Sequence, residues 1–456
     1  MAAVVDADLQ VESGPREAPL TLDQPAPRVL GWMDQTGLWF NLGISLLGPV
    51  GAVYVLQPDG VHAMSFLAAT AAIVLGTVLG TLLVAAAAVP GAETGAPAMV
   101  LLRGLFGVRL SYLPTLVNIV QLVGWSVFEI VVISEAAQQL LPWRAHLWPY
   151  VVVAGVLTTA MAIRPLGVVR VLRRYALVAV TLAMAYLFVQ LLRHPLPSVT
   201  HGTWHGFWTG TDYVIAVAVS WAPLASDYSR HARSPRGAFG AAMVGYTVAQ
   251  VACYVLGLIA LFTVVAASDT NMQHDMFARF IAVPLGWLAF AALVARELDQ
   301  SFADSYSTVV SIQNVVPRMD RRLLAVVVGG LATGLALLFG IGSYANFLLL
   351  LGSVFVPLTA VLLVDYLVGH RGRWNVGGDA PVRWVMVLPW IAGIVVYQLV
   401  NPGYVGWWAS AWGDVAQWID FTPSSWMSAS VLSFVVAAVV TLPMTLASRR
   451  RHAIAR

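Results

Sequence analysis

Three residues with polar or aromatic side chains recur every four positions within one apolar segment. They are Gln121, Trp125 and Glu129, so on an α-helix they would lie on one face. The amide offers a hydrogen-bond donor and acceptor, and the indole offers a broad face for stacking. A carboxylate inside a membrane helix costs about 2.5–3.5 kcal/mol on insertion scales, so it usually faces the protein interior. The trio suits a small, flat, polar heterocycle; hydrogen-bonded packing between helices is the alternative.

A second polar concentration lies at residues 296–308. At 100° per residue, four of its side chains would form one narrow stripe: Glu297, Ser301, Asp304 and Thr308. Asp299 points nearly the opposite way. Carboxylates and hydroxyls are ligands for Na⁺, and a buried carboxylate can also carry a proton. We expect a functional role for Asp299 and treat Asp304 as a second candidate, whereas Arg296 would simply neutralise Glu297.

Two of the apolar segments that must position these groups are interrupted. The segment at about 38–57 contains Gly48-Pro49, and the one at about 210–226 contains Pro223. A broken membrane helix frees backbone groups that lipid leaves unsatisfied, so breaks are tolerated where they line a cavity or bind something. Breaks at corresponding positions of two halves indicate an inverted-repeat transporter with its site at the bilayer midplane.

Other aromatic and acidic residues near the breaks receive different interpretations. Trp221 could stack on a substrate from the side opposite Trp125. Asp227 and Asp365 stand at the ends of apolar segments beside arginines and are interpreted as anchors. The tryptophan-rich segment 406–418 is typical of an interfacial belt.

The composition is that of a membrane protein. Of the 456 residues, 59% are hydrophobic and only 10% are charged, far from the averages of soluble domains. The lone cysteine excludes an internal disulfide, and the nine histidines show no metal-ligand spacing. Apolar stretches of the length that a bilayer requires predict twelve spans, at 38–57, 63–89, 112–139, 147–163, 175–192, 210–226, 238–267, 281–308, 324–341, 344–368, 383–400 and 427–447.

The polar segments set the domain organisation and the orientation. Residues 1–32 contain several prolines and no apolar core, which predicts a disordered cytoplasmic tail. Residues 33–370 would form the transporter core, 371–448 two further spans, and 449–456 a basic cytoplasmic tail. All 25 basic residues are arginines, and they concentrate in every second loop. The positive-inside rule therefore places both termini in the cytoplasm, and the net charge of +3 reflects topology rather than nucleic-acid binding.

Four segments together resemble the nucleobase–cation symporter-1 family, which comprises purine, cytosine, allantoin and hydantoin permeases. The likeness extends from about residue 20 to 375. Within the family, the sequence resembles the bacterial purine–cytosine permease branch. The matching segments are Gln121–Trp125, Trp221–Arg230, Asp299–Thr308 and Val364–Leu367.

The resemblance implies a five-plus-five inverted repeat with broken helices 1 and 6, followed by two appended helices. It also implies a substrate that lies between spans 1, 3, 6 and 8 and is stacked by aromatic side chains. Trp125 matches the aromatic of span 3, and Trp221 stands near that of span 6.

The resemblance also bears on the coupling ion. Where the family binds Na⁺, backbone carbonyls of span 1 and hydroxyls of span 8 supply the ligands. Gly43 and Leu46 align with the carbonyl positions, whereas Asp299 and Gln300 stand where the hydroxyls are expected. Because these groups replace the hydroxyls, both Na⁺ and a proton carried on Asp299 are candidate coupling ions.

We therefore expect an importer in the cytoplasmic membrane that accumulates a nucleobase, cytosine or a purine, by Na⁺ or H⁺ symport through alternating access. The expected substrate-binding residues are Gln121, Trp125, Trp221, Glu129 and Asp304. A hydroxymethylpyrimidine or other thiamine precursor, allantoin or a hydantoin is the alternative substrate. We expect no cofactor beyond the coupling ion. A channel and an intramembrane enzyme are alternatives of a different class, and no His/Asp/Ser constellation supports an enzyme.

Overall fold

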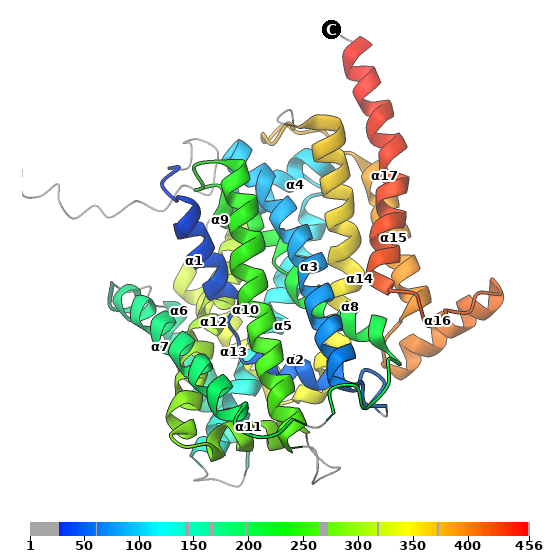
Figure 1. The fold of residues 1–456 in the computed structure, drawn as a ribbon. Helices are drawn as coiled ribbons and strands as arrows, with labels where there is room; N and C mark the ends of the chain where they lie inside the picture. The colour runs from blue at the N-terminus through cyan, green and yellow to red at the C-terminus, as the bar shows by residue number, and fades with distance from the viewer. Residues whose placement is uncertain are drawn as a thin grey trace, which may run out of the picture.

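The computed structural model describes residues 27–60, 62–141, 146–163, 167–196, 198–264, 272–316, 319–371 and 374–454, which fold mainly into helices (Figure 1). The first half of the bundle contains α1 (Trp32–Gly43), α2 (Leu47–Leu56), α3 (Phe66–Thr94), α4 (Ala98–Phe106), α5 (Tyr112–Leu140), α6 (Trp148–Ile163) and α7 (Gly167–Leu191). The next part contains α8 (Phe207–Val219), η2 (Ala222–Leu224), α9 (Ala225–Ser229), α10 (Pro235–Val264), α11 (Met272–Ala282), α12 (Gly286–Val315), α13 (Arg321–Ala336), η3 (Ile341–Ser343), α14 (Tyr344–Leu363) and η4 (Val364–His370).

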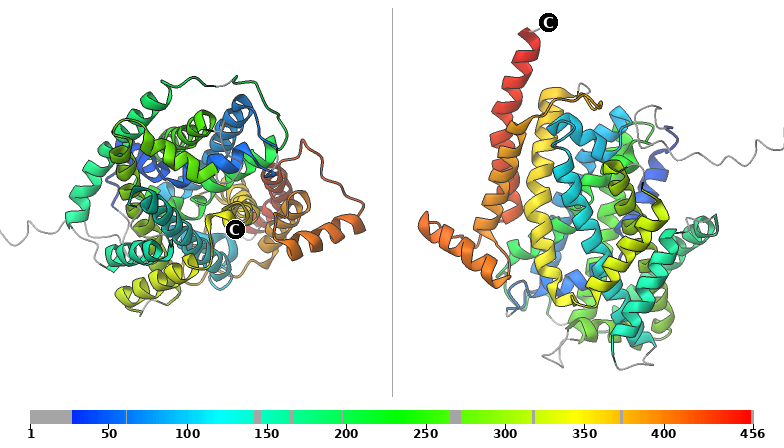
Figure 2. Two further views of the ribbon diagram at one scale, coloured as in Figure 1. Left: turned by 90° about the horizontal axis from the view of Figure 1, so that it is seen from below. Right: turned by 180° about the vertical axis from the view of Figure 1, so that it is seen from behind.

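The chain then continues along one side of this bundle. The remaining helices are η5 (Trp384–Met386), α15 (Val387–Val400), α16 (Gly406–Trp418) and α17 (Ala429–Ile454). Helix α16 projects sideways from the bundle (Figure 2). Its side chains Trp407 and Trp418 are exposed. The start of α1 and the end of α17 lie at the same end of the bundle (Figure 1). Most of the predicted tail at residues 1–32 lies outside the described residues.

Each predicted span overlaps a helix or a broken pair of helices. Of the described helices, five are long and apolar enough to cross a membrane by themselves, or six if the bent pair α1 and α2 counts as one span. Four further apolar helices are shorter. The all-helical architecture is as predicted, and the count of twelve spans stays a prediction. The short helix α4 lies between predicted spans, and α11 lies almost entirely between two of them; neither helix was foreseen.

The break in the first span exists but lies four residues before its predicted position. Helix α1 ends at Gly43, α2 begins at Leu47, and their axes differ by 60°. Pro49 is the third residue of α2, within its first turn. The first amide groups of a helix have no intrahelical acceptor, so a proline is tolerated there. The prediction that Gly48-Pro49 forms the interruption is therefore wrong in position.

The break in the sixth span lies where it was predicted. Helix α8 ends at Val219, the 3₁₀ turn η2 contains Pro223, and the short helix α9 follows. Proline has no N–H to donate and therefore weakens a continuous helical ladder at this point.

Glycines let α10 pack tightly against the broken first span. A Cβ atom added at Gly48 would lie 2.5 Å from Cβ of Cys253, and one added at Gly51 would lie 2.6 Å from the hydroxyl of Tyr254. Small residues allow membrane helices to approach this closely. The glycine-rich sequence of α2 thus serves packing against α10, and Cys253 is a buried packing residue.

Buried carboxylates attach the last helix to the core at two levels. Asp365 in η4 accepts hydrogen bonds from Arg383, Trp374 and Thr445, the last of which lies in α17. This geometry fits the anchoring role expected for Asp365. Near the start of α17, Asp212 of α8 accepts hydrogen bonds from the hydroxyl of Ser428 and from the N–H groups of two following residues.

We predict that Asp212→Ala weakens the docking of α17. The substitution leaves buried donors at the helix start without their acceptor, which costs about 1–3 kcal/mol for each unsatisfied group. The thermal unfolding temperature of the purified protein in detergent should fall. Asp414→Ala, at an exposed position of α16, is the matched control. Equal unfolding temperatures for both variants would contradict this account of how α17 is held.

Candidate substrate pocket

A cavity lies where the two broken spans meet. It contains about 530 Å³ of space not filled by atoms, a volume that includes space open to solvent. Its walls come from α1, α2, α5, α8, η2, α10 and α12. Helices from distant parts of the chain therefore enclose it, and both interruptions contribute to its lining.

Two tryptophans supply the aromatic part of the lining. Trp125 of α5 and Trp221, beside the sixth-span break, both line the cavity and are each 8% exposed. The Trp125 ring is held by edge-on contacts with Tyr344 and Phe347, at centroid distances of 6.1 and 5.2 Å. Trp221 packs against Tyr228 at 6.4 Å. The two indoles are thus positioned by other rings and still present surface to the cavity.

The cavity also brings together four other residues that the sequence singled out: Gly43, Glu129, Gln300 and Asp304. The carboxyl groups of Glu129 and Asp304 are hydrogen-bonded to each other. Both side chains are almost fully buried, with exposed fractions of 1% and 3%. Oε2 of Glu129 is buried and accepts no hydrogen bond from a donor among the described residues. This wall of the cavity is therefore polar, and one of its hydrogen-bond acceptors has no donor among these residues.

Three of the predicted site residues lie outside the lining of this cavity. Gln121 donates from Nε2 to the side chain of Asn118 and to the carbonyl of Ser220, so it holds the sixth-span break to α5. Leu46 lies in the first-span break. Asp299 lies beside Arg296, with 3.4 Å between its Oδ2 and Nη1 of the guanidinium.

Adjacent residues of α12 contact both ends of the first-span break. Arg296 donates from Nη2 to the carbonyl of Asn41, near the end of α1, at 2.6 Å. Glu297 accepts from the N–H of Leu46 at 2.7 Å and from the hydroxyl of Ser45 at 2.8 Å. The carboxyl end of a helix carries partial negative charge and the amino end partial positive charge. Each α12 side chain thus complements the helix end that it meets, beyond the mutual neutralisation that the sequence predicted.

Helix α10 provides lining residues that sequence reasoning missed. Tyr246, Gln250 and Tyr254 all face the cavity. Gln250 Oε1 and the Tyr254 hydroxyl are buried with no hydrogen-bond partner in the described part of the chain. The three residues recur every four positions in an apolar segment, as Gln121, Trp125 and Glu129 do. The same spacing rule would therefore have found them.

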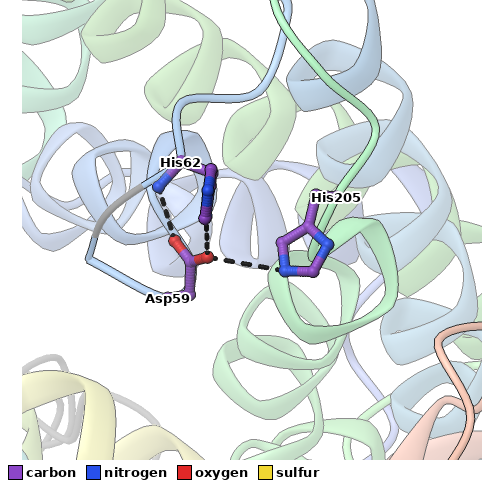
Figure 3. A group of neighbouring side chains, drawn as sticks. All are labelled: Asp59, His62 and His205. Carbon is purple, nitrogen blue, oxygen red and sulfur yellow. Dashed lines mark hydrogen bonds and ion pairs between the residues drawn. The ribbon is translucent and has the colours of Figure 1, made fainter.

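Three residues from two distant parts of the sequence also meet away from the cavity. Asp59, His62 and His205 lie between the end of α2 and the segment before α8 (Figure 3). His62 Nδ1 is 2.7 Å and His205 Nε2 is 3.5 Å from Oδ2 of Asp59. These contacts link the connection that follows α2 to the one that precedes α8. The two histidines are largely exposed.

Comparison with known proteins assigns the family. Residues 31–380 match the family model described as permeases for cytosine/purines, uracil, thiamine and allantoin. The chain belongs to this permease family. The predicted resemblance to the nucleobase–cation symporter-1 family is thereby confirmed, and the relatives are permeases rather than enzymes.

Relatives of this permease are distant in sequence. A purine-uracil permease from Arabidopsis thaliana is 25% identical over 397 residues, which cover 77% of this chain and 64% of the plant protein. The chain thus spans less than two thirds of that relative's length. The putative purine-cytosine permease YxlA of Bacillus subtilis is 23% identical over 380 residues, covering 76% of this chain and 81% of the relative.

Solved structures confirm the fold class. The inward-facing structure of Mhp1 is similar over 97% of this chain and 96% of Mhp1, with a TM-score of 0.74 and 14% identity. A closed structure of Mhp1, a nucleobase–cation symporter-1 transporter with bromovinylhydantoin bound, covers 95% and 96% with a TM-score of 0.68 and 17% identity. The permease therefore has the transporter fold expected from its broken helices 1 and 6.

We predict that Glu297→Ala destabilises the permease. The substitution removes the acceptor of the Leu46 N–H and the Ser45 hydroxyl inside a buried break, where each unpaired group costs about 1–3 kcal/mol. Thermal unfolding in detergent should show a lower midpoint, and Glu297→Gln, which keeps an acceptor of the same shape, should show a smaller decrease. An unfolding midpoint of Glu297→Ala equal to that of the wild type would show that the break is held by other contacts.

Proposed function

We propose that this permease imports a nucleobase, cytosine or a purine, across the cell membrane by cation-coupled alternating access. The observation that carries the proposal is the cavity between the two breaks. Two tryptophans and a pair of carboxyl groups line this cavity. A planar base has apolar faces and a polar edge, so its recognition requires stacking together with hydrogen bonds.

The lining residues divide between these two tasks. Trp125 and Trp221 stack on the faces of the base, and Glu129 and Asp304 bind its edge. Gln121 acts indirectly, because its amide is engaged with the carbonyl of Ser220, which itself lines the cavity. Gln250 and Tyr254, whose polar atoms are buried without partners, add hydrogen-bonding capacity on the α10 wall.

The coupling groups expected from the sequence surround the end of α1. Gly43 and Gln300 line the cavity, Leu46 lies in the break and Asp299 flanks Arg296. We propose that the inward gradient of Na⁺ or H⁺ acts at this junction of the first span and α12. The arginine distribution supports a cytoplasmic position for both termini.

The family description and the relatives define the competing substrates. The family includes uracil, thiamine and allantoin permeases as well as cytosine and purine permeases. A yeast vitamin B6 transporter is 25% identical over 209 residues. Thiamine precursors, allantoin and hydantoins are therefore the substrates against which a nucleobase must be compared.

Uptake into proteoliposomes tests the proposed substrate. We expect labelled cytosine or adenine to accumulate above its external concentration under an imposed Na⁺ or pH gradient. Unlabelled nucleobases should compete better than allantoin, hydantoin or hydroxymethylpyrimidine. Failure of every nucleobase, together with uptake of one of these competitors, would refute the nucleobase assignment.

We predict that Trp125→Ala weakens substrate binding on the order of tenfold to hundredfold. Stacking of a base on an aromatic side chain contributes about 1–3 kcal/mol, and about 1.4 kcal/mol corresponds to a tenfold change. The apparent affinity can be measured by uptake at several substrate concentrations. Trp418→Ala, at a position that is 86% exposed on α16, is the matched control. Equal apparent affinities for the two variants would remove Trp125 from the site.

A further inference from the structure

Two buried carboxyl groups from different helices meet in the cavity wall. Glu129 of α5 and Asp304 of α12 are hydrogen-bonded to each other through their side chains. An ionised carboxylate can only accept hydrogen bonds, so a hydrogen bond between two carboxyl groups requires that one of them be protonated. Two carboxyl groups in contact share a single proton in the same way in other buried sites. The proton of this pair lies at the wall of the proposed substrate cavity.

The charges around the pair favour this arrangement. Glu297, about two helical turns before Asp304 on α12, adds a third buried carboxyl group. Arg296 is the basic side chain that faces this cluster. Full ionisation of all three acids would leave excess negative charge in a water-poor interior, which is strongly unfavourable. The neighbouring α10 and α14 contribute neutral titratable side chains: Tyr246, Cys253, Tyr254 and Tyr344.

The end of α1 already has a cation that belongs to the chain. The last carbonyls of a helix attract positive charge, which makes the interruption of a membrane helix a favourable place for a bound cation. In this permease the guanidinium of Arg296 donates to the carbonyl of Asn41 at 2.6 Å and to Gln300 Oε1 at 2.9 Å. Arg296 is only 3% exposed. A permanently charged side chain thus performs at this helix end the electrostatic role that a bound metal cation would have.

We propose that the coupling ion is a proton and that the Glu129–Asp304 pair carries it. This inference rests on the proposed function and specifies its ion. Because the pair lines the substrate cavity, binding of a base edge and binding of the proton are linked by direct contact, and each changes the affinity for the other. The proton enters from the outer solution with the substrate and leaves to the cytoplasm when the cavity opens inward.

The assignment replaces the carrier that the sequence favoured. Asp299 was expected to hold the ion, but its carboxylate lies beside Arg296 and outside the cavity lining. A proton on Asp299 would therefore have no direct contact with a substrate in this cavity. Glu129 and Asp304 come from different helices, α5 and α12, so a change in their separation can accompany opening of the site.

Transport measurements separate coupling from substrate recognition. In Na⁺-free proteoliposomes, an inward proton gradient should drive accumulation of the nucleobase, with an upper limit of about tenfold per pH unit for one proton. The amides in Glu129→Gln and Asp304→Asn cannot exchange a proton. If these variants still exchange substrate in counterflow, the ratio of internal to external substrate under a proton gradient should fall to one. Glu135→Gln, an acid-to-amide change on the same helix outside the cavity lining, should accumulate substrate like the wild type.

Two results of these measurements would overturn the inference. One is accumulation that requires a Na⁺ gradient and ignores the proton gradient. The other is undiminished proton-driven accumulation in Asp304→Asn or Glu129→Gln.

An infrared measurement tests the pair without any substrate. If counterflow of every tested nucleobase fails in the wild type, the proposed substrate class is wrong, and the state of the pair is then decided spectroscopically. The purified wild type at neutral pH should show the carbonyl band of a protonated carboxyl group that Asp304→Asn loses. Absence of this band in the wild type, or an unchanged band in Asp304→Asn, would contradict the shared proton.

Discussion

The interruption of the first membrane helix imposes the constraint on which the rest of the structure depends. Two helix ends with opposite partial charges lie inside a region where water is scarce, and their free backbone groups need partners. Successive residues of α12 meet this need, because Arg296 contacts the end of α1 and Glu297 contacts the start of α2. Helix α12 is therefore held against the break by charge as well as by packing.

The cavity follows from this arrangement. Glycines of α2 allow α10 to close one side of the break, and α5 contacts α12 through the Glu129–Asp304 hydrogen bond. The sixth-span break is tied to α5 by Gln121, whose amide donates to the carbonyl of Ser220. Helices α1, α2, α5, α10 and α12 and the sixth-span break thus meet at this polar junction. A substrate or proton that changes the contacts here acts on both breaks together.

Periodicity in the sequence predicted the helical fold and much of the cavity wall. Trp125 and Glu129 were found because a four-residue spacing places side chains on one helical face irrespective of tertiary structure. The position of the first break was missed, because proline is compatible with the first turn of a helix and therefore marks the start of α2 rather than the gap. Asp299 was favoured over Glu297 because Arg296 was expected to neutralise Glu297. Helical periodicity does not show which face of α12 meets the break.

Contacts between distant segments were beyond what spacing could indicate. Asp59 and His205 are separated by several helices in the chain, and their proximity depends on how two connections pack (Figure 3). The same is true of the carboxyl pair, whose members are on α5 and α12. The family resemblance supplied the overall arrangement of these helices, but the charges at the first break belong to this chain's own residues.

The most direct test of the account is the position of a bound base. Crystals of the permease with a brominated nucleobase that competes for uptake would locate the bromine by its anomalous scattering. The account predicts a ring between Trp125 and Trp221, with its polar edge at Glu129 and Asp304. A base bound outside this cavity, with the two tryptophans packed only against protein, would contradict it.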